Sequence, residues 1–70
     1  MKRWEILKRI SERAAVAGVT WEVQREGANH TVYRLGASTV PIPRHVEIGP
    51  GLSEDIFKQC EPELGERWWR

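Results

Sequence analysis

Cysteine is nearly absent from this 70-residue chain, which contains only Cys60. A single thiol can form no internal disulfide and cannot build a cysteine-based zinc site. The two histidines, His30 and His45, have no carboxylate at motif spacing beside them and give no pattern of metal ligands. We therefore expect no metal or other cofactor, and a cytoplasmic location.

Long apolar runs and a strong charge of one sign are also missing. No stretch approaches the ~18 residues of a membrane-spanning helix, and Glu5 interrupts the place where a signal-peptide core would stand. A total of 11 Lys and Arg against 10 Asp and Glu leaves a net charge of +1. This balance argues against binding to nucleic acid by bulk charge alone, but not against a local basic face formed by Arg25, Arg34 and Arg44.

The chain is short enough for one domain, which we expect to span residues 1–70. A chain of this length buries only about 60% of its unfolded surface, so its core is thin. A net stability of ~3–5 kcal/mol is expected for such a scaffold. Association with a second copy or with a partner protein would add to it.

Apolar residues near the N-terminus recur every three or four positions, which predicts an amphipathic helix that ends at Gly18. Its expected apolar face contains Trp4, Ile6, Leu7, Ile10, Ala14 and Ala17. The other face is basic and either stays solvated or contacts phosphates or an acidic partner. Its residues are Lys2, Arg3, Lys8, Arg9 and Arg13.

Alternation of apolar and polar residues predicts three strands, over 20–25, 30–35 and 39–43. The prolines of the third strand place it at a sheet edge. The turns fall at 26–29, where glycine and asparagine tolerate positive φ, and at 36–38.

A second helix is expected over about 51–60, with Glu54 and Asp55 in its first turn and Pro62 ending or kinking it. Its expected apolar face contains Leu52, Ile56, Phe57 and Cys60. The order α-β-β-β-α predicts an α+β fold, in which a three-stranded antiparallel sheet carries both helices on one face. Double-stranded-RNA-binding domains have this architecture.

The tail over 61–70 contains the adjacent Trp68 and Trp69, flanked by Arg67 and Arg70. Two readings stay open for this pair. Either the tail folds back on the sheet or the first helix, or it forms part of a surface for a partner or a second copy.

Three segments between residues 3 and 60 resemble one family of small proteins. Residues 27–33 place a glycine and small residues before His30, with an aromatic three places later. Residues 40–45 read V-P-I-P-R-H, and residues 47–59 match the pattern E-I-x-x-G-x-L-x-x-I-x-K-Q. These motifs resemble the HicA (YcfA) toxins of bacterial HicAB toxin–antitoxin systems, with Asn29 where that family more commonly has serine.

The resemblance implies a small endoribonuclease that cleaves mRNA or other single-stranded RNA and so inhibits translation and growth. It also implies a cognate HicB-type antitoxin that neutralises the enzyme, and a double-stranded-RNA-binding-domain-like fold. The family's motif histidine is catalytic, and its counterpart here is His30.

Metal-independent RNA cleavage needs a base for the ribose 2′-hydroxyl and an acid for the leaving 5′-oxygen. A positioned imidazole can supply either, for a ~100- to 10,000-fold gain. We expect His30 to perform one of these steps. The groups expected to bind the phosphate are turn amides and cationic side chains, from Gly27, Asn29, Arg34, Arg44 and Lys58.

Simpler roles compete with these. His30 could instead hydrogen-bond a neighbouring turn, and His45 is either a solvated loop residue or a second acid–base group. Tyr33 shares a strand face with Thr31, which favours core packing over base stacking. For the whole protein, the alternatives are a non-catalytic RNA-binding module of the same fold and a protein-interaction domain.

Overall fold

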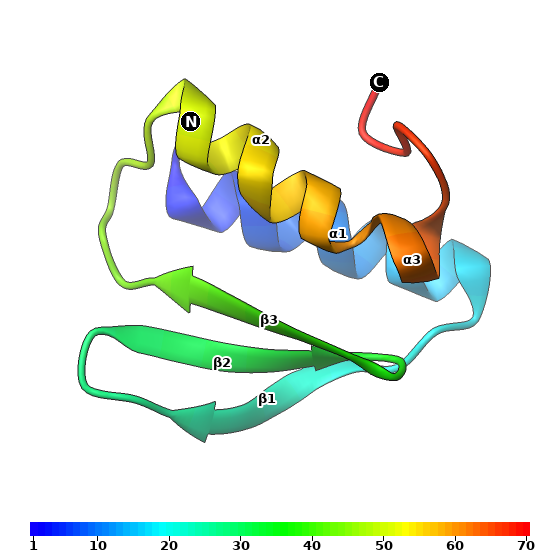
Figure 1. Ribbon diagram of the computed structural model, residues 1–70, viewed down its shortest axis with the longest axis horizontal. Coiled ribbons are helices and arrows are strands. Elements are labelled where there is room, and N and C mark those ends of the chain that lie inside the picture. The colour runs from blue at the N-terminus through cyan, green and yellow to red at the C-terminus, as the bar shows by residue number, and fades with distance from the viewer.

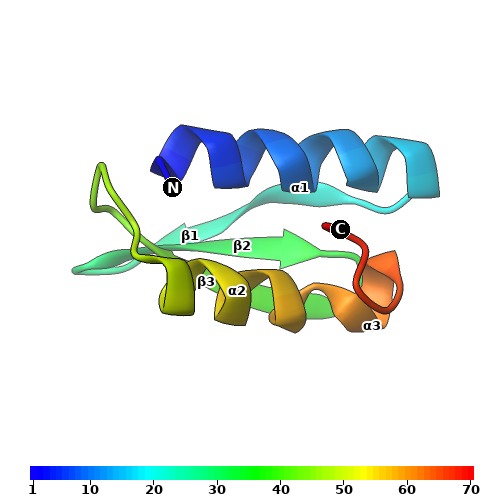
Figure 2. The ribbon, with the colours of Figure 1, turned by 90° about the horizontal axis from the view of Figure 1, so that it is seen from above.

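The computed structural model describes all 70 residues and contains six elements. They are α1 (Arg3–Ala17), β1 (Trp21–Glu26), β2 (His30–Leu35), β3 (Ser38–Pro43), α2 (Pro50–Gln59) and α3 (Glu61–Leu64). The strands form one antiparallel sheet in the order β1-β2-β3. Figures 1 and 2 show α1 and α2 side by side on one face of this sheet, with the other face left bare. The predicted α+β class and layer arrangement are confirmed, and α3 is an additional element.

Helix α1 ends as predicted, because Gly18 adopts the left-handed conformation with φ 71°. Its buried face, however, consists of Ile6, Ile10 and Ala14. Trp4 was expected in the core but is 62% exposed. Each helical residue turns by about 100°, so Trp4 points about 200° away from Ile6 and faces solvent.

The two faces of the sheet follow the alternation along β2. Tyr33 and Leu35 pack with the core under the helices, whereas Val32 is buried but does not belong to that core. His30, Val32 and Arg34 therefore share the bare face. In β1 the register shifts between Val23 and Arg25, so that Arg25 pairs with Val32. This β-bulge moves Arg25 off the face of Val23 and onto the face of His30, against the strict alternation read from the sequence.

Strand β3 lies at a sheet edge, as its prolines predicted. The amide of Arg44 donates to the carbonyl of Asn29 over 3.3 Å. Hydrogen-bonded pairs alternate along an antiparallel ladder, so Pro41 and Pro43 occupy positions whose missing N–H would point away from β2.

Helix α2 begins at Pro50, one residue earlier than predicted. Glu54 and Asp55 consequently lie beyond its first turn, which contains no acid. Leu52, expected in the core, is exposed, while Ile56, Phe57 and Cys60 are buried as predicted. The earlier start of α2 has a simple cause. Proline is well suited to the first helical turn, where its missing N–H costs nothing.

The tail packs back onto the body of the protein, against both long helices and the start of β3. The indole N–H of Trp68 donates to the carbonyl of Phe57 over 2.8 Å. The Phe57 ring lies 5.1 Å from the ring of Trp68 and 5.8 Å from that of Trp69. Leu64 of α3 joins the core cluster. Trp68 and Trp69 also line a hollow with Arg13 and Val16 of α1, and the hydroxyl of Ser38 at the start of β3 donates to the Glu63 carboxylate over 3.3 Å. The tail therefore enlarges a small core by folding back on the first helix and the sheet, as one reading of the sequence expected, and it contacts the second helix as well.

Candidate functional site

His30 is the first residue of β2 and its side chain is exposed on the bare face of the sheet. Its backbone carbonyl accepts hydrogen bonds from Gly27 and Arg44. Its ring nitrogens form no hydrogen bond within the protein. The interpretation of His30 as a turn-bonding structural residue therefore does not hold for the imidazole, which is free to meet a ligand.

An open hollow of about 420 Å³ surrounds this imidazole. Val32, which is 7% exposed, lies two residues after His30 on the bare face, between its strand partners Arg25 and Pro41. The hollow is lined by Arg25, Gly27, Ala28, Asn29, His30, Val32 and Pro41. It thus combines one imidazole, one guanidinium and a turn of exposed backbone.

The β1–β2 turn is closed by the amide of Gly27, which donates to the carbonyl of His30 over 2.8 Å. No residue from Gly27 to Asn29 has a positive φ, so the reason for glycine inferred from the sequence was wrong. A Cβ at Gly27 would lie 3.1 Å from the His30 carbonyl oxygen, tighter than an ordinary contact. Glycine is needed here for close approach of the backbone.

Arg44 braces this turn from the loop that follows β3. Its Nη1 donates to the Glu26 carboxylate over 2.8 Å and to the His30 carbonyl over 2.9 Å. Its Nη2 donates to the carbonyls of Ala28, over 2.7 Å, and of Gly27. A guanidinium has four terminal N–H groups and one Nε–H. Since all four terminal groups bind the protein, Arg44 positions the turn that carries His30.

A second layer of contacts fixes the brace to the rest of the fold. Glu26 also accepts a hydrogen bond from the hydroxyl of the buried Thr31 over 2.8 Å. Arg3, at the start of α1, donates to that hydroxyl over 3.1 Å and to the carbonyl of Pro43 over 3.0 Å. The first residue of the helix is thus tied to all three strands. Arg3 is therefore not simply part of a solvated basic face.

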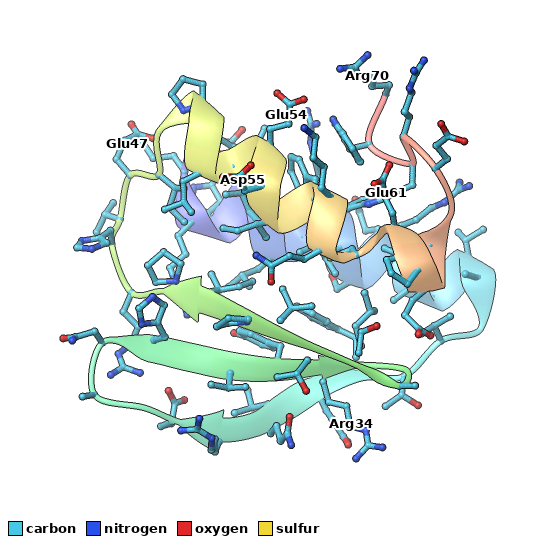
Figure 3. The ribbon with its side chains drawn as sticks, viewed as in Figure 1. Arg34, Glu47, Glu54, Asp55, Glu61 and Arg70 are labelled. Carbon is cyan, nitrogen blue, oxygen red and sulfur yellow. The ribbon has the colours of Figure 1, made fainter.

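The other expected phosphate ligands do not converge on His30. Arg34 lies four residues further along β2, about 13 Å away at the usual strand rise, and bonds the carbonyl of Gly36. Figure 3 shows it pointing away from the helices, at the end of the sheet opposite the β1–β2 turn. Lys58 lies on α2, across the sheet from His30, and pairs with Glu54 at 3.7 Å.

The turn amides divide into two kinds. That of Gly27 is used by His30, whereas those of Ala28 and Asn29 donate to no group of the protein. Both residues line the hollow around His30. These two N–H groups can bind an anionic oxygen without breaking any bond of the fold.

Two further aromatic candidates, Tyr33 and His45, lie outside the hollow of His30. Tyr33 stacks on Trp21 with ring centroids 4.4 Å apart, on the helix side, so its role is packing. His45 is exposed, and it lines a neighbouring hollow with Ala28, Asn29 and Arg44. The second imidazole therefore adjoins Ala28 and Asn29, two turn residues that also line the hollow of the first.

Arg25 is the site residue whose place the sequence did not give. Among the three central arginines it alone lines the hollow of His30. The signal that brings it there is the β-bulge, whose extra residue reverses the alternation of β1. No local pattern in 20–26 marks that bulge.

Searches against protein-family models, curated proteins and solved structures returned no match to this chain. No group of three or more His, Cys, Asp or Glu side chains is placed to hold a metal ion. None of the helices has the length and apolar character required to cross a bilayer.

Proposed function

We propose that this protein is a HicA-like endoribonuclease toxin that cleaves mRNA in the cytoplasm and is neutralised by a HicB-type antitoxin. The observation that carries the proposal is His30, an exposed imidazole without bonds to the protein, held at a strand start by a braced turn. The order α-β-β-β-α with both helices on one face supports a double-stranded-RNA-binding-domain-like fold.

In the proposed reaction the ribose 2′-hydroxyl loses its proton and its oxygen attacks the adjacent phosphorus. The bond to the 5′-oxygen breaks, that oxygen gains a proton, and a 2′,3′-cyclic phosphate remains. His30 serves as the base or as the acid. The free amides of Ala28 and Asn29 and the guanidinium of Arg25 are suited to stabilising the charge on the phosphate.

The alternative is a non-catalytic RNA-binding module. One observation favours it: His30 is the only imidazole, carboxyl or thiol side chain lining its hollow. Catalysis with both an acid and a base would then need a second group, and His45, which adjoins the same turn, is our candidate for it.

The test is cleavage of single-stranded RNA by purified wild-type protein and by His30→Ala, with growth arrest on expression as the cellular readout. The proposal predicts that His30→Ala loses cleavage and toxicity while keeping its melting temperature and its antitoxin binding, because the side chain is exposed. A fully toxic His30→Ala refutes the assignment. Salt-sensitive RNA binding by a wild-type protein that cleaves nothing establishes the alternative.

A further inference from the structure

Two large apolar side chains lie exposed beside the site. Trp4 is 62% exposed and Val46 is 75% exposed. Together with Arg3 and Arg44 they line an open hollow of about 380 Å³. The amide of Arg3 donates to the carbonyl of Val46 over 2.9 Å, so the loop and the start of α1 hold the two side chains in a fixed relation. Figures 1 and 2 show this loop running past the N-terminal end of α1.

This hollow continues to His30 through shared residues. Arg44 also lines the next hollow, with His45, Ala28 and Asn29. Ala28 and Asn29 in turn line the hollow of His30. The three hollows therefore adjoin one another through shared lining residues, and together they form a track from the Trp4 indole past the β1–β2 turn to the imidazole.

The charge of the track differs from that of the other hollows on the surface. Three arginines line it, Arg3, Arg25 and Arg44, and no carboxylate does. The two other hollows along α1 both include Glu12. One of them lies on the other side of the Trp4 indole, where Glu5 and Glu12 accompany Lys8 and Arg9. Arg44 is paired with the Glu26 carboxylate at 2.8 Å, so the net positive charge of the track comes from Arg3 and Arg25.

We propose that this track binds single-stranded RNA, with one base stacked on the Trp4 indole while a phosphate of the same strand lies at His30. This inference rests on the proposed function and adds to it a base-binding subsite. An exposed indole near cations suits an unpaired nucleotide, because any base can stack on the indole and each phosphodiester linkage carries a negative charge that the cations attract. Bases inside a duplex are already stacked and cannot reach it.

The test is binding of short single-stranded RNA whose 2′-hydroxyls are replaced by fluorine, so that cleavage is blocked, measured by fluorescence anisotropy. We expect Trp4→Ala to weaken binding by about 10- to 100-fold, and Trp4→Phe, which keeps an aromatic ring, by less than about threefold. Val16→Ala is the matched control, because Val16 is an exposed apolar residue on the same helix.

An abasic nucleotide moved along the strand then identifies the stacked base. In the wild type one position weakens binding as strongly as Trp4→Ala does, and in Trp4→Ala that position has no further effect, since the same contact is already lost. Quenching of tryptophan fluorescence by the RNA is lost in Trp4→Phe.

The outcomes separate this inference from the proposed function. Unchanged RNA affinity in Trp4→Ala overturns the stacking subsite, even when His30-dependent cleavage is observed. If Trp4→Ala binds RNA normally but no longer binds a protein partner, the patch belongs to that partner instead. Trp4-dependent RNA binding without any cleavage overturns the endoribonuclease and leaves the subsite standing. A wild-type protein that binds no RNA overturns both.

Discussion

Replacement of Arg44 by lysine tests whether this residue braces the turn or binds phosphate. Lysine keeps the positive charge but lacks the planar fork of four terminal N–H groups. The wild-type fork reaches the Glu26 carboxylate and the carbonyls of His30, Gly27 and Ala28. We therefore expect Arg44→Lys to loosen the turn that positions His30.

The magnitude follows from the exposure of these contacts. The Arg44 side chain is 39% exposed, so the ion pair with Glu26 contributes only ~0–1 kcal/mol. Each of the three backbone bonds is worth about 0.5–1.5 kcal/mol, part of which lysine or water recovers. A loss of ~1–2 kcal/mol lowers the melting temperature by roughly 4–16 °C in a domain of this size.

The assays are thermal unfolding, amide hydrogen exchange and RNA cleavage. A braced turn predicts faster exchange of the Gly27 amide, and a fall in kcat with little change in KM. A phosphate ligand predicts the reverse pattern, with a higher KM, unchanged melting and exchange, and a salt slope that stays close to the wild-type value because lysine keeps the charge. Wild-type melting and exchange in Arg44→Lys, together with a higher KM, would refute the brace. Glu26→Gln is the control, because an amide oxygen still accepts from Arg44 and Thr31.

Three further substitutions test other parts of the structure. Gly27→Ala should lower the cleavage rate severalfold, because the new Cβ would press on the His30 carbonyl oxygen. The free energy of unfolding should change by less than ~1 kcal/mol, because Gly27 has an ordinary φ that alanine also adopts. An unchanged cleavage rate would count against the close-approach role. Burial raises the pKa of Cys60 to about 12. Between pH ~9, the pKa of the thiol in the unfolded chain, and pH ~12, only the unfolded chain loses the thiol proton. The free energy of unfolding should therefore fall by ~1.4 kcal/mol per pH unit in this range. Urea titrations of Cys60→Ala at the same pH values should not show this slope. Trp68→Phe removes the indole bond to Phe57 and should cost ~1 kcal/mol in thermal unfolding; an unchanged melting temperature would show that the tail is not held there.

Much of the fold could be predicted because the local signals agree with the packing. The bounds of β2 are those expected, 30–35, and Gly18 ends α1 in the left-handed conformation. The edge position of β3 followed from its prolines, which cannot donate to a central ladder. The placement of His30 at a strand start followed from the same alternation.

The rest depended on contacts distant in sequence. Two sets of residues in α1 satisfy helical spacing, one with Trp4 and one with Ile6, and only the packed structure selects the second. An arginine such as Arg44 looks the same in sequence whether it binds phosphate or a turn seventeen residues away. The docking of Trp68 on Phe57 likewise has no local pattern.

The most direct test of the central claim is single-turnover cleavage of a single-stranded RNA by purified wild-type protein and by His30→Ala, with a chelator present. The account predicts that the wild type leaves a 2′,3′-cyclic phosphate, and that His30→Ala, equally folded and equally able to bind the RNA, is slower by about 100-fold or more. Equal rates in the two proteins would contradict it.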